Sequence, residues 1–113
     1  MTTGRGDRAV LIYTTTGSPE DAAAIAGKVV GEGLAACANI FPGMTSVYVW
    51  KGAVQRDSET AMLLKTLPEL RAAAMAAVRA CHPYETPAVL AIPADQVDAD
   101  CLAWMRAGTG QAR

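Results

Sequence analysis

Residues 41–66 read "FPGMTSVYVWKGAVQRDSETAMLLKT", and this stretch decides the fold. Valines alternate with Tyr48 and Trp50, a period of two that is typical of a β-strand. A returning strand is predicted over 59–66, with the turn carried by "KGAVQRDS" (51–58). Two long strands joined this tightly outrun an ordinary sheet and need a surface to pack on, which favours an oligomer.

Pro42 and Gly43 interrupt the first strand of this hairpin, which begins upstream in "LAACANI" (34–40). Proline donates no hydrogen bond to a neighbouring strand, so it is found mainly at sheet edges and at bulges. The interruption therefore predicts a β-bulge or an edge strand.

The chain before the hairpin predicts a strand and a helix. Residues 9–15 ("AVLIYTT") form a continuous apolar, β-branched run, which predicts a central strand buried on both faces. Ser18 is a favourable N-cap and Pro19 a favourable first helical residue. Apolar residues then recur three and four positions apart over 22–30, and Gly33 is a natural stop.

The chain after the hairpin predicts a helix over 68–81, a strand over 88–93 and a short helix over about 98–107. The apolar stripe of the helix over 68–81 is predicted at Leu70, Ala73, Ala74, Ala77, Val78 and Cys81. The predicted order is thus β-α-β-β-α-β with a final helix. Two crossover helices on one face of a four-stranded antiparallel sheet make a ferredoxin-like α+β fold.

Length and composition fit one folded domain. The chain has 113 residues, of which 51% are hydrophobic and 19% charged, so it can bury a core. We expect a single domain over 9–107, a flexible arm over 1–8 and a flexible tail over 108–113. The mean hydropathy of +0.18 is high for so small a domain, so a partner is expected to cover apolar surface.

The charge pattern excludes several classes of partner. The net charge is −1 and the basic residues are scattered, which argues against nucleic acid as a partner. No apolar run approaches the roughly 20 residues that a membrane helix needs, so no membrane contact is expected. The polar start "MTTGRGDR" (1–8) lacks the apolar stretch of a signal peptide, which predicts a cytoplasmic protein.

Three cysteines without a CxxC spacing indicate reduced, mostly buried thiols rather than a disulfide framework. Cys37 lies in an apolar strand and is expected in the core, and Cys101 is expected to be buried in the last helix. Cys81 falls on the apolar side of its predicted helix, so its sulfur is expected to face the core.

The loop "CHPYETP" (81–87) contains the only histidine. In a functional reading, His82 and Cys81 offer a nitrogen and sulfur pair for copper or zinc. In a structural reading, His82 is a partly buried side chain that holds the helix-to-strand loop by a hydrogen bond. One histidine and one cysteine are too few for a closed metal site, unless further copies of the chain add ligands.

Other polar residues allow more than one interpretation. Tyr84 and Glu85 belong either to a loop stiffened by its prolines or to the wall of a cleft between subunits. Glu59 and Lys65 share one face of the returning strand, and they either face solvent, pair across a subunit boundary or line a polar cleft.

Aromatic residues on the hairpin point to an interface. Trp50 is large and amphipathic, which predicts an anchor in a subunit interface, and Tyr48 shares its face of the strand.

Five motifs in this order, "GLAACANI", "FPGMTSVYVWKG", "ETAMLLKT", "HPYETP" and "CLAWM", resemble the CutA family of divalent-cation tolerance proteins. The resemblance covers about residues 9–106. It implies a ferredoxin-like fold, a homotrimer assembled through the long hairpin, and a similarity to trimeric PII signalling proteins. It also implies tolerance of copper and other divalent ions. Some relatives carry two histidines in place of Cys81 and His82, and a cysteine in place of Tyr13, as candidate copper ligands.

Three functions follow from the residues and the resemblance together. The first is a cytoplasmic homotrimer of the CutA type in the response to divalent metal ions. It would need no cofactor, and copper or another divalent ion would bind weakly at clefts between subunits. The second is a PII-like regulator that senses a small molecule. The third, an enzyme using His82 with Lys65 or Glu85, is disfavoured because the sequence shows no set of nucleophile, base and orienting group.

Overall fold

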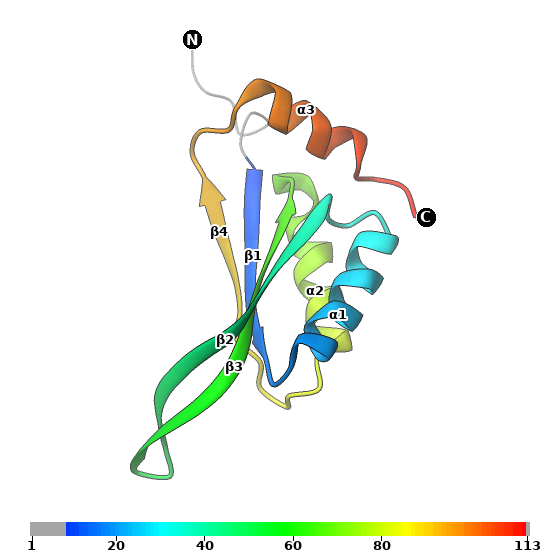
Figure 1. The fold of residues 1–113 in the computed structure, drawn as a ribbon. Helices are drawn as coiled ribbons and strands as arrows, with labels where there is room; N and C mark the ends of the chain where they lie inside the picture. Colours follow the sequence, from blue (N-terminus) through cyan, green and yellow to red (C-terminus); the bar gives the residue numbers. More distant parts are fainter. Residues whose placement is uncertain (1–8, 113) are drawn as a thin grey trace.

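The computed structural model describes residues 9–112, so the arm expected over 1–8 lies outside the described residues. The elements in chain order are β1 (Ala9–Thr16), α1 (Pro19–Gly31), β2 (Cys37–Trp50), β3 (Ala53–Thr66), a 3₁₀ turn (Pro68–Leu70), α2 (Arg71–Cys81), β4 (Val89–Ala94) and α3 (Ala99–Ala107). The strands form an antiparallel sheet in the order β2-β3-β1-β4, and α1 and α2 lie together on one of its faces (Figure 1). The predicted ferredoxin-like α+β fold is confirmed.

Helix α1 begins and ends where its sequence predicts. The Ser18 hydroxyl accepts a hydrogen bond from the Asp21 amide at 3.1 Å, and Pro19 occupies the first turn. Ile25 and Val29 are buried against the sheet. The helix ends at Gly31, and Gly33 takes a left-handed φ of 76° that directs the chain into β2.

The hairpin is tighter than predicted. Its turn is only Lys51-Gly52, not the whole of 51–58, and β3 starts at Ala53. Both turn residues have positive φ, 51° and 77°, as a type I′ turn requires. The polar residues expected in a loop therefore belong to an exposed strand, and β2 and β3 each reach 14 residues.

The predicted interruption at Pro42-Gly43 is a bulge on an edge strand. Phe41 pairs with Ala61 and Met44 pairs with Glu59, so two residues of β2 face one residue of β3. Strand β2 lies at the edge of the sheet, where a proline costs no ladder hydrogen bond.

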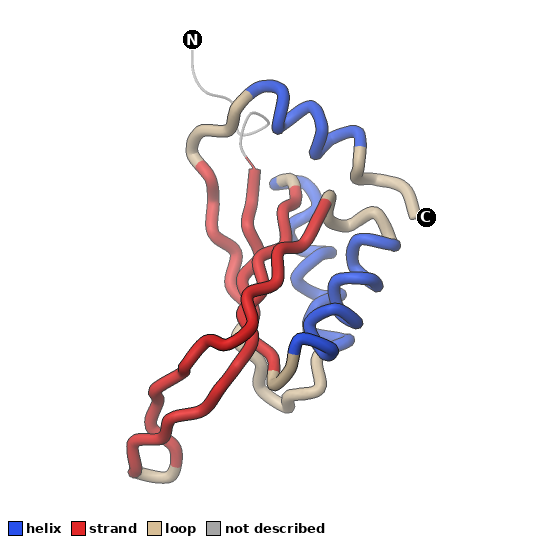
Figure 2. Tube along the Cα trace, in the orientation of Figure 1, coloured by secondary structure: helices blue, strands red, loops and turns tan. Residues whose placement is uncertain are grey.

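Beyond this bulge the hairpin leaves the body of the molecule, as Figure 2 shows. The chain measures 50 × 32 × 22 Å and has a radius of gyration of 15.0 Å. A compact chain of this length would have about 13 Å. The excess comes from the end of the hairpin, which no other part of residues 9–112 covers.

The two faces of the sheet differ. On β1, Val10, Ile12 and Thr14 face the helices and are buried, while Leu11 and Tyr13 lie on the opposite face and are half-buried. The prediction of a central strand is confirmed. The prediction that both its faces are buried is wrong for one chain, because within residues 9–112 no second layer covers the sheet opposite α1 and α2. We call this uncovered side the open face.

Helix α2 differs from its prediction in detail. A 3₁₀ turn replaces its first residues, and Ala74 and Val78 are the buried positions, with Met75 half-buried beside them. Ala74 and Val78 are four positions apart, and His82 lies four positions after Val78. The buried row of the helix therefore continues to His82. Cys81 is exposed, which makes the expectation of a core-facing sulfur wrong.

Helix α3 lies across the end of the sheet and is anchored by Met105, which packs with Leu67 and Ala9 (Figure 1). The Arg106 guanidinium also lies 3.0 Å from a carboxylate oxygen of Glu69 in the 3₁₀ turn. Both side chains are exposed, so this ion pair adds little stability.

The segment after α3, expected as a flexible tail, makes specific contacts over its described part. The Gly110 amide donates a hydrogen bond of 2.8 Å to the Gly33 carbonyl, and the backbone of Gln111 lies against Gly33. These contacts attach the end of the chain to the turn between α1 and β2.

Replacing Thr14 by valine is expected to stabilise the protein by about 1–2 kcal/mol. The Thr14 hydroxyl is fully buried and is the buried side-chain oxygen without a hydrogen-bond partner among the described residues. The matched control is Thr66→Val, because the equally buried Thr66 hydroxyl donates to the Leu34 carbonyl at 2.6 Å, so its loss should destabilise. Urea unfolding at one protein concentration measures both changes, and equal signs for the two variants would refute the explanation.

Candidate functional site

The loop between α2 and β4 is held by His82. Its Nε2 lies 2.8 Å from the carbonyl oxygen of Thr15, and its Nδ1 accepts a hydrogen bond of 3.1 Å from the Tyr84 amide. The His82 side chain is buried, with 9% of its surface exposed. Thr15 lies one residue beyond the last β1–β4 pair, so the imidazole extends the hydrogen bonding of β1 past the start of β4.

Tyr84 connects this loop to the hairpin. Its ring packs on the His82 ring with centroids 4.8 Å apart, and its hydroxyl donates a hydrogen bond of 3.0 Å to Glu59 Oε2. The same hydroxyl would lie 3.4 Å from a methyl group placed on Gly17, so the β1–α1 turn closes over it. Three segments far apart in sequence therefore meet at the Tyr84 phenol.

A second phenol–carboxylate pair lies beside the first. The Tyr48 hydroxyl donates to Asp57, and both Asp57 and Glu59 contribute to the electrostatic environment of Tyr48. The hydrogen bond to Asp57, followed by partial burial, raises the pKa of Tyr48. We call Tyr48, Asp57, Glu59 and Tyr84 the phenol–carboxylate cluster.

Sequence reasoning missed the role of Asp57. Tyr48 pairs directly with Gln55, and Asp57 is the diagonal neighbour two residues further along β3. The two-residue turn fixes this register, so a correct turn would have placed Asp57 next to Tyr48.

The remaining cleft candidates do not join this cluster. Lys65 is half-buried on the open face, where it pairs with Cys37 and Leu11. Six residues of strand separate it from Glu59, about 20 Å, so the two cannot pair within one chain. Glu85 is exposed in the loop.

The candidate copper ligands do not converge. Cys81 is exposed at the end of α2, whereas His82 is buried. Tyr13 lies on the open face and its hydroxyl contacts the Met44 sulfur at 3.8 Å. Among residues 9–112, no three side chains of the types His, Cys, Asp and Glu gather into a metal site.

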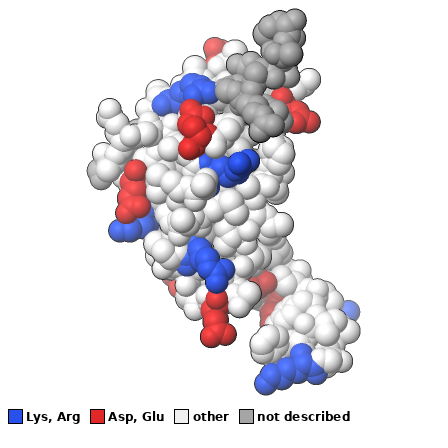
Figure 3. Space-filling view, turned by 180° about the vertical axis from the view of Figure 1, so that it is seen from behind, with Lys and Arg blue, Asp and Glu red and all other residues white. Residues whose placement is uncertain are grey.

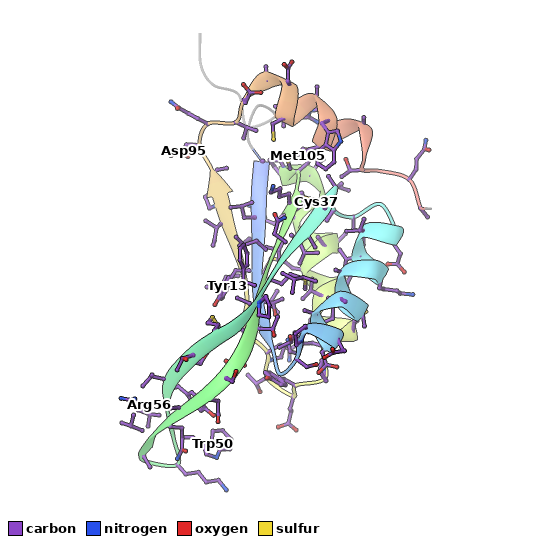
Figure 4. All side chains as sticks on the ribbon, viewed as in Figure 1. Tyr13, Cys37, Trp50, Arg56, Asp95 and Met105 are labelled. Carbon is purple, nitrogen blue, oxygen red and sulfur yellow. The ribbon has the colours of Figure 1, made fainter. Side chains whose placement is uncertain are left out.

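The other cysteines are also less buried than predicted. Cys37 is half-buried because it lies on the open face of β2, and Figure 4 shows it near the end of that strand, apart from Tyr13. Cys101 is exposed because α3 buries the row that contains Met105. All three thiols are free.

The open face exposes several large apolar side chains. Leu90 and Ile92 of β4 are 50% and 43% exposed, Phe41 of β2 is 50% exposed, and Trp50 near the hairpin tip is 60% exposed (Figure 4). The register places their side chains on the same face as Leu11 and Leu63. Single exposed apolar residues are ordinary, but several large ones on one sheet face mark an interaction surface.

Charges form no basic patch on the face drawn in Figure 3, where basic and acidic side chains are interspersed over wide uncharged areas. Within residues 9–112, no helix is both long and apolar enough to cross a membrane.

Comparison with known proteins identifies the family of this chain. The family model described as CutA1 divalent ion tolerance protein matches residues 10–108. The chain belongs to the CutA1 family. The divalent-cation tolerance protein CutA of Citrobacter koseri is 38% identical over 99 residues, which span 88% of this chain and 86% of that protein.

Solved CutA structures share the fold described above. CutA1 of Ehrlichia chaffeensis superposes with a TM-score of 0.88 at 38% identity, covering 90% of this chain and 95% of the other. CutA of Archaeoglobus fulgidus, described as a periplasmic divalent cation tolerance protein, superposes with a TM-score of 0.84 at 37% identity, covering 88% and 97%. This chain is therefore a CutA-type divalent-cation tolerance protein with the CutA1 fold.

In this CutA protein, Tyr84 is expected to lose its proton only near pH 12. Burial first, then the hydrogen bond and the charge of Glu59, raise the pKa of Tyr84 to about 12, whereas a tyrosine in the unfolded chain titrates near 10. Because the folded pKa is the higher one, the stabilisation is complete below about pH 10 and is lost as the pH rises to 12.

Glu59→Gln is expected to lower the pKa of Tyr84 but to leave it above 10, because burial remains. Ultraviolet absorbance of the phenolate measures the titration, and Tyr84→Phe assigns it among the tyrosines. An unchanged titration in Glu59→Gln would show that the phenol does not contact this carboxylate in solution.

Proposed function

We propose that this CutA protein is a cytoplasmic homotrimer whose subunit boundaries bind divalent metal ions weakly. The observation that carries the proposal is the open face: β1, β3 and β4 present half-buried and exposed apolar residues there, and the hairpin projects beyond the body. Covering this face would remove apolar area from water, which is the main driving force for association. Three copies is the number that the resemblance to the CutA family implies.

Within residues 9–112, no three metal-ligating side chains lie together, so the proposed site has to take its ligands from more than one copy. A divalent ion needs more ligands than one chain brings together, and symmetry repeats every ligand at each boundary. Asp57 and Glu59 carry the carboxylates of the phenol–carboxylate cluster on the open face, and oxygen ligands suit a weakly held divalent ion. They are our candidate ligands.

Sedimentation equilibrium tests the assembly, and we expect the mass of three chains. A monomer at micromolar concentration would remove the assembly and the shared site together.

Calorimetric titration with Cu²⁺, Zn²⁺ and Cd²⁺ tests the site. Glu59→Gln is expected to weaken binding by at least about tenfold, which is the loss typical even of an outer-shell group. The control is Glu32→Gln, because Glu32 is an exposed residue directly after α1 that pairs with Lys28 of this helix. Equal binding in both variants would exclude Glu59 as a ligand.

The phenol–carboxylate cluster also supports the PII-like alternative, in which a small polar molecule binds between subunits. Its paired donors and acceptors could hydrogen-bond such a ligand. A thermal-shift screen of metabolites separates the two functions: a compound that raises the melting temperature while the three metal ions do not would favour the regulator.

The cytoplasmic location also needs a test, since the relative from Archaeoglobus fulgidus is described as periplasmic. Fractionation of cells expressing the native gene, followed by immunodetection, should recover the protein with cytoplasmic markers. Recovery with periplasmic markers would overturn this part of the proposal.

A further inference from the structure

We infer that His82 is a positioning residue in this chain and not a metal ligand: it ties the α2–β4 loop to β1 and sets Tyr84 against Glu59. The contacts lie within one chain, so the inference does not depend on the number of copies. It also leaves the carboxylate site proposed above unaffected.

The two hydrogen bonds fix the protonation of the imidazole. The Thr15 carbonyl can only accept, so Nε2 must carry a proton. The Tyr84 amide can only donate, so Nδ1 must offer its lone pair. Neutral His82 therefore exists as the Nε2–H tautomer, and its one lone pair is already used.

A metal ion binds histidine through such a lone pair. Coordination through Nδ1 would break the hydrogen bond from the Tyr84 amide, and coordination through Nε2 would break both bonds, because the proton would move to Nδ1. Either change would leave a polar backbone group at this buried side chain without its partner, at a free-energy cost.

Within residues 9–112, no neighbouring ligand of the same chain compensates for that cost. Cys81 is exposed while His82 is buried, and the Tyr13 hydroxyl contacts the Met44 sulfur. The residues at the family's candidate copper positions therefore do not fit a copper site in this chain.

The same contacts explain what His82 does instead. The bond to Nδ1 fixes the backbone of Tyr84, and the two rings pack 4.8 Å apart at an interplanar angle of 52°. This arrangement leaves the Tyr84 hydroxyl 3.0 Å from Glu59 Oε2. Pro83 and Pro87 restrict the backbone of the loop. Within that restricted loop, the contacts with His82 determine where Tyr84 lies.

The wild-type protein provides the first test. It contains a single histidine, so its ring signals in long-range ¹H–¹⁵N correlation spectra need no assignment. We expect the pattern of the Nε2–H tautomer, and we expect these signals to persist after addition of one equivalent of Cu²⁺ per chain. An Nδ1–H pattern, or selective broadening of the ring signals by substoichiometric Cu²⁺, would overturn the inference.

Three variants separate positioning from general stability. His82→Ala should make exchange of the Tyr84 amide hydrogen about fivefold faster or more, as expected for the loss of one hydrogen bond. His82→Asn should restore protection of this amide, because an asparagine oxygen can accept from the amide two residues on. His82→Gln, whose longer side chain reaches Thr15 instead, should not.

Equal exchange of the Tyr84 amide in the alanine, asparagine and glutamine variants would contradict the inference. If the alanine variant does not fold, the contrast between asparagine and glutamine still decides it.

Discussion

Leu90→Asp is expected to convert the proposed trimer into folded monomers. Leu90 lies on the open face of β4 and is half exposed in the single chain, so the substitution leaves the helix-side core intact. In the assembly, the same position would bury a carboxylate in an apolar interface. Because Leu90 is already half covered in the single chain, the change loses about half of the 1.5–3 kcal/mol of full leucine burial per copy, and it adds the larger cost of desolvating a charge.

Sedimentation equilibrium and far-ultraviolet circular dichroism together measure this outcome. We expect the mass of one chain with an unchanged spectrum. The control is Ala73→Asp, because Ala73 is exposed on α2 and lies on the helix layer, away from the open face. A variant at Leu90 that remains trimeric would show that β4 is not part of the interface.

Trp50→Asp examines the hairpin end of the same surface. Trp50 is 60% exposed near the tip, and the Lys51 Nζ lies 5.8 Å from the centroid of its ring. If Trp50 is an anchor, the substitution should make the trimer dissociate at low protein concentration. It should not abolish the trimer, as Leu90→Asp does. An unchanged trimer would reject its role as an anchor.

Features set by neighbouring residues could be predicted from the sequence. Ser18 and Pro19 fix the start of α1 locally, and Pro42 cannot donate to a ladder wherever it lies in the fold. The β2–β3 turn was predicted to be too long, and the reason is also local. Lys51 adopts a positive φ, a conformation for which asparagine or aspartate is the usual signature, and the polar strand after it resembles a loop.

The site could be predicted only in part, because its contacts join distant residues. His82 bonds to Thr15 across 67 positions, and Tyr84 reaches Glu59 across 25. The loop sequence over 81–87 identified His82 and Tyr84 as candidates, but only the tertiary fold decides that both nitrogens of His82 are engaged. Cys81 was misplaced because the buried row of α2 advances by four residues, from Val78 to His82.

Gly33→Ala is expected to destabilise the protein by about 2–4 kcal/mol through two separate causes. Gly33 has a φ of 76°, and a left-handed conformation costs alanine about 1–2 kcal/mol. A methyl group there would also lie within 2.6 Å of the backbone carbon and nitrogen of Gln111. Backbone atoms cannot move aside as a flexible side chain can, so the C-terminal segment would have to leave the α1–β2 turn.

The two causes can be separated by shortening the chain. In a chain ending at Gly108, the collision with Gln111 is absent and only the conformational strain remains. Gly33→Ala should therefore cost about 1–2 kcal/mol less in the short chain than in the full one, as measured by urea unfolding. An equal cost in both lengths would mean that the segment after α3 does not rest against this turn in solution.

Gly27→Ala is the matched control, with the opposite sign expected. Gly27 lies within α1, and a methyl group there would meet nothing within 4 Å. Alanine is the better helix former, so this variant should gain about 0.5–1 kcal/mol. The same chemical change would thus stabilise at one glycine and destabilise at another six residues away. The contrast depends only on the backbone conformation and on what the added carbon touches.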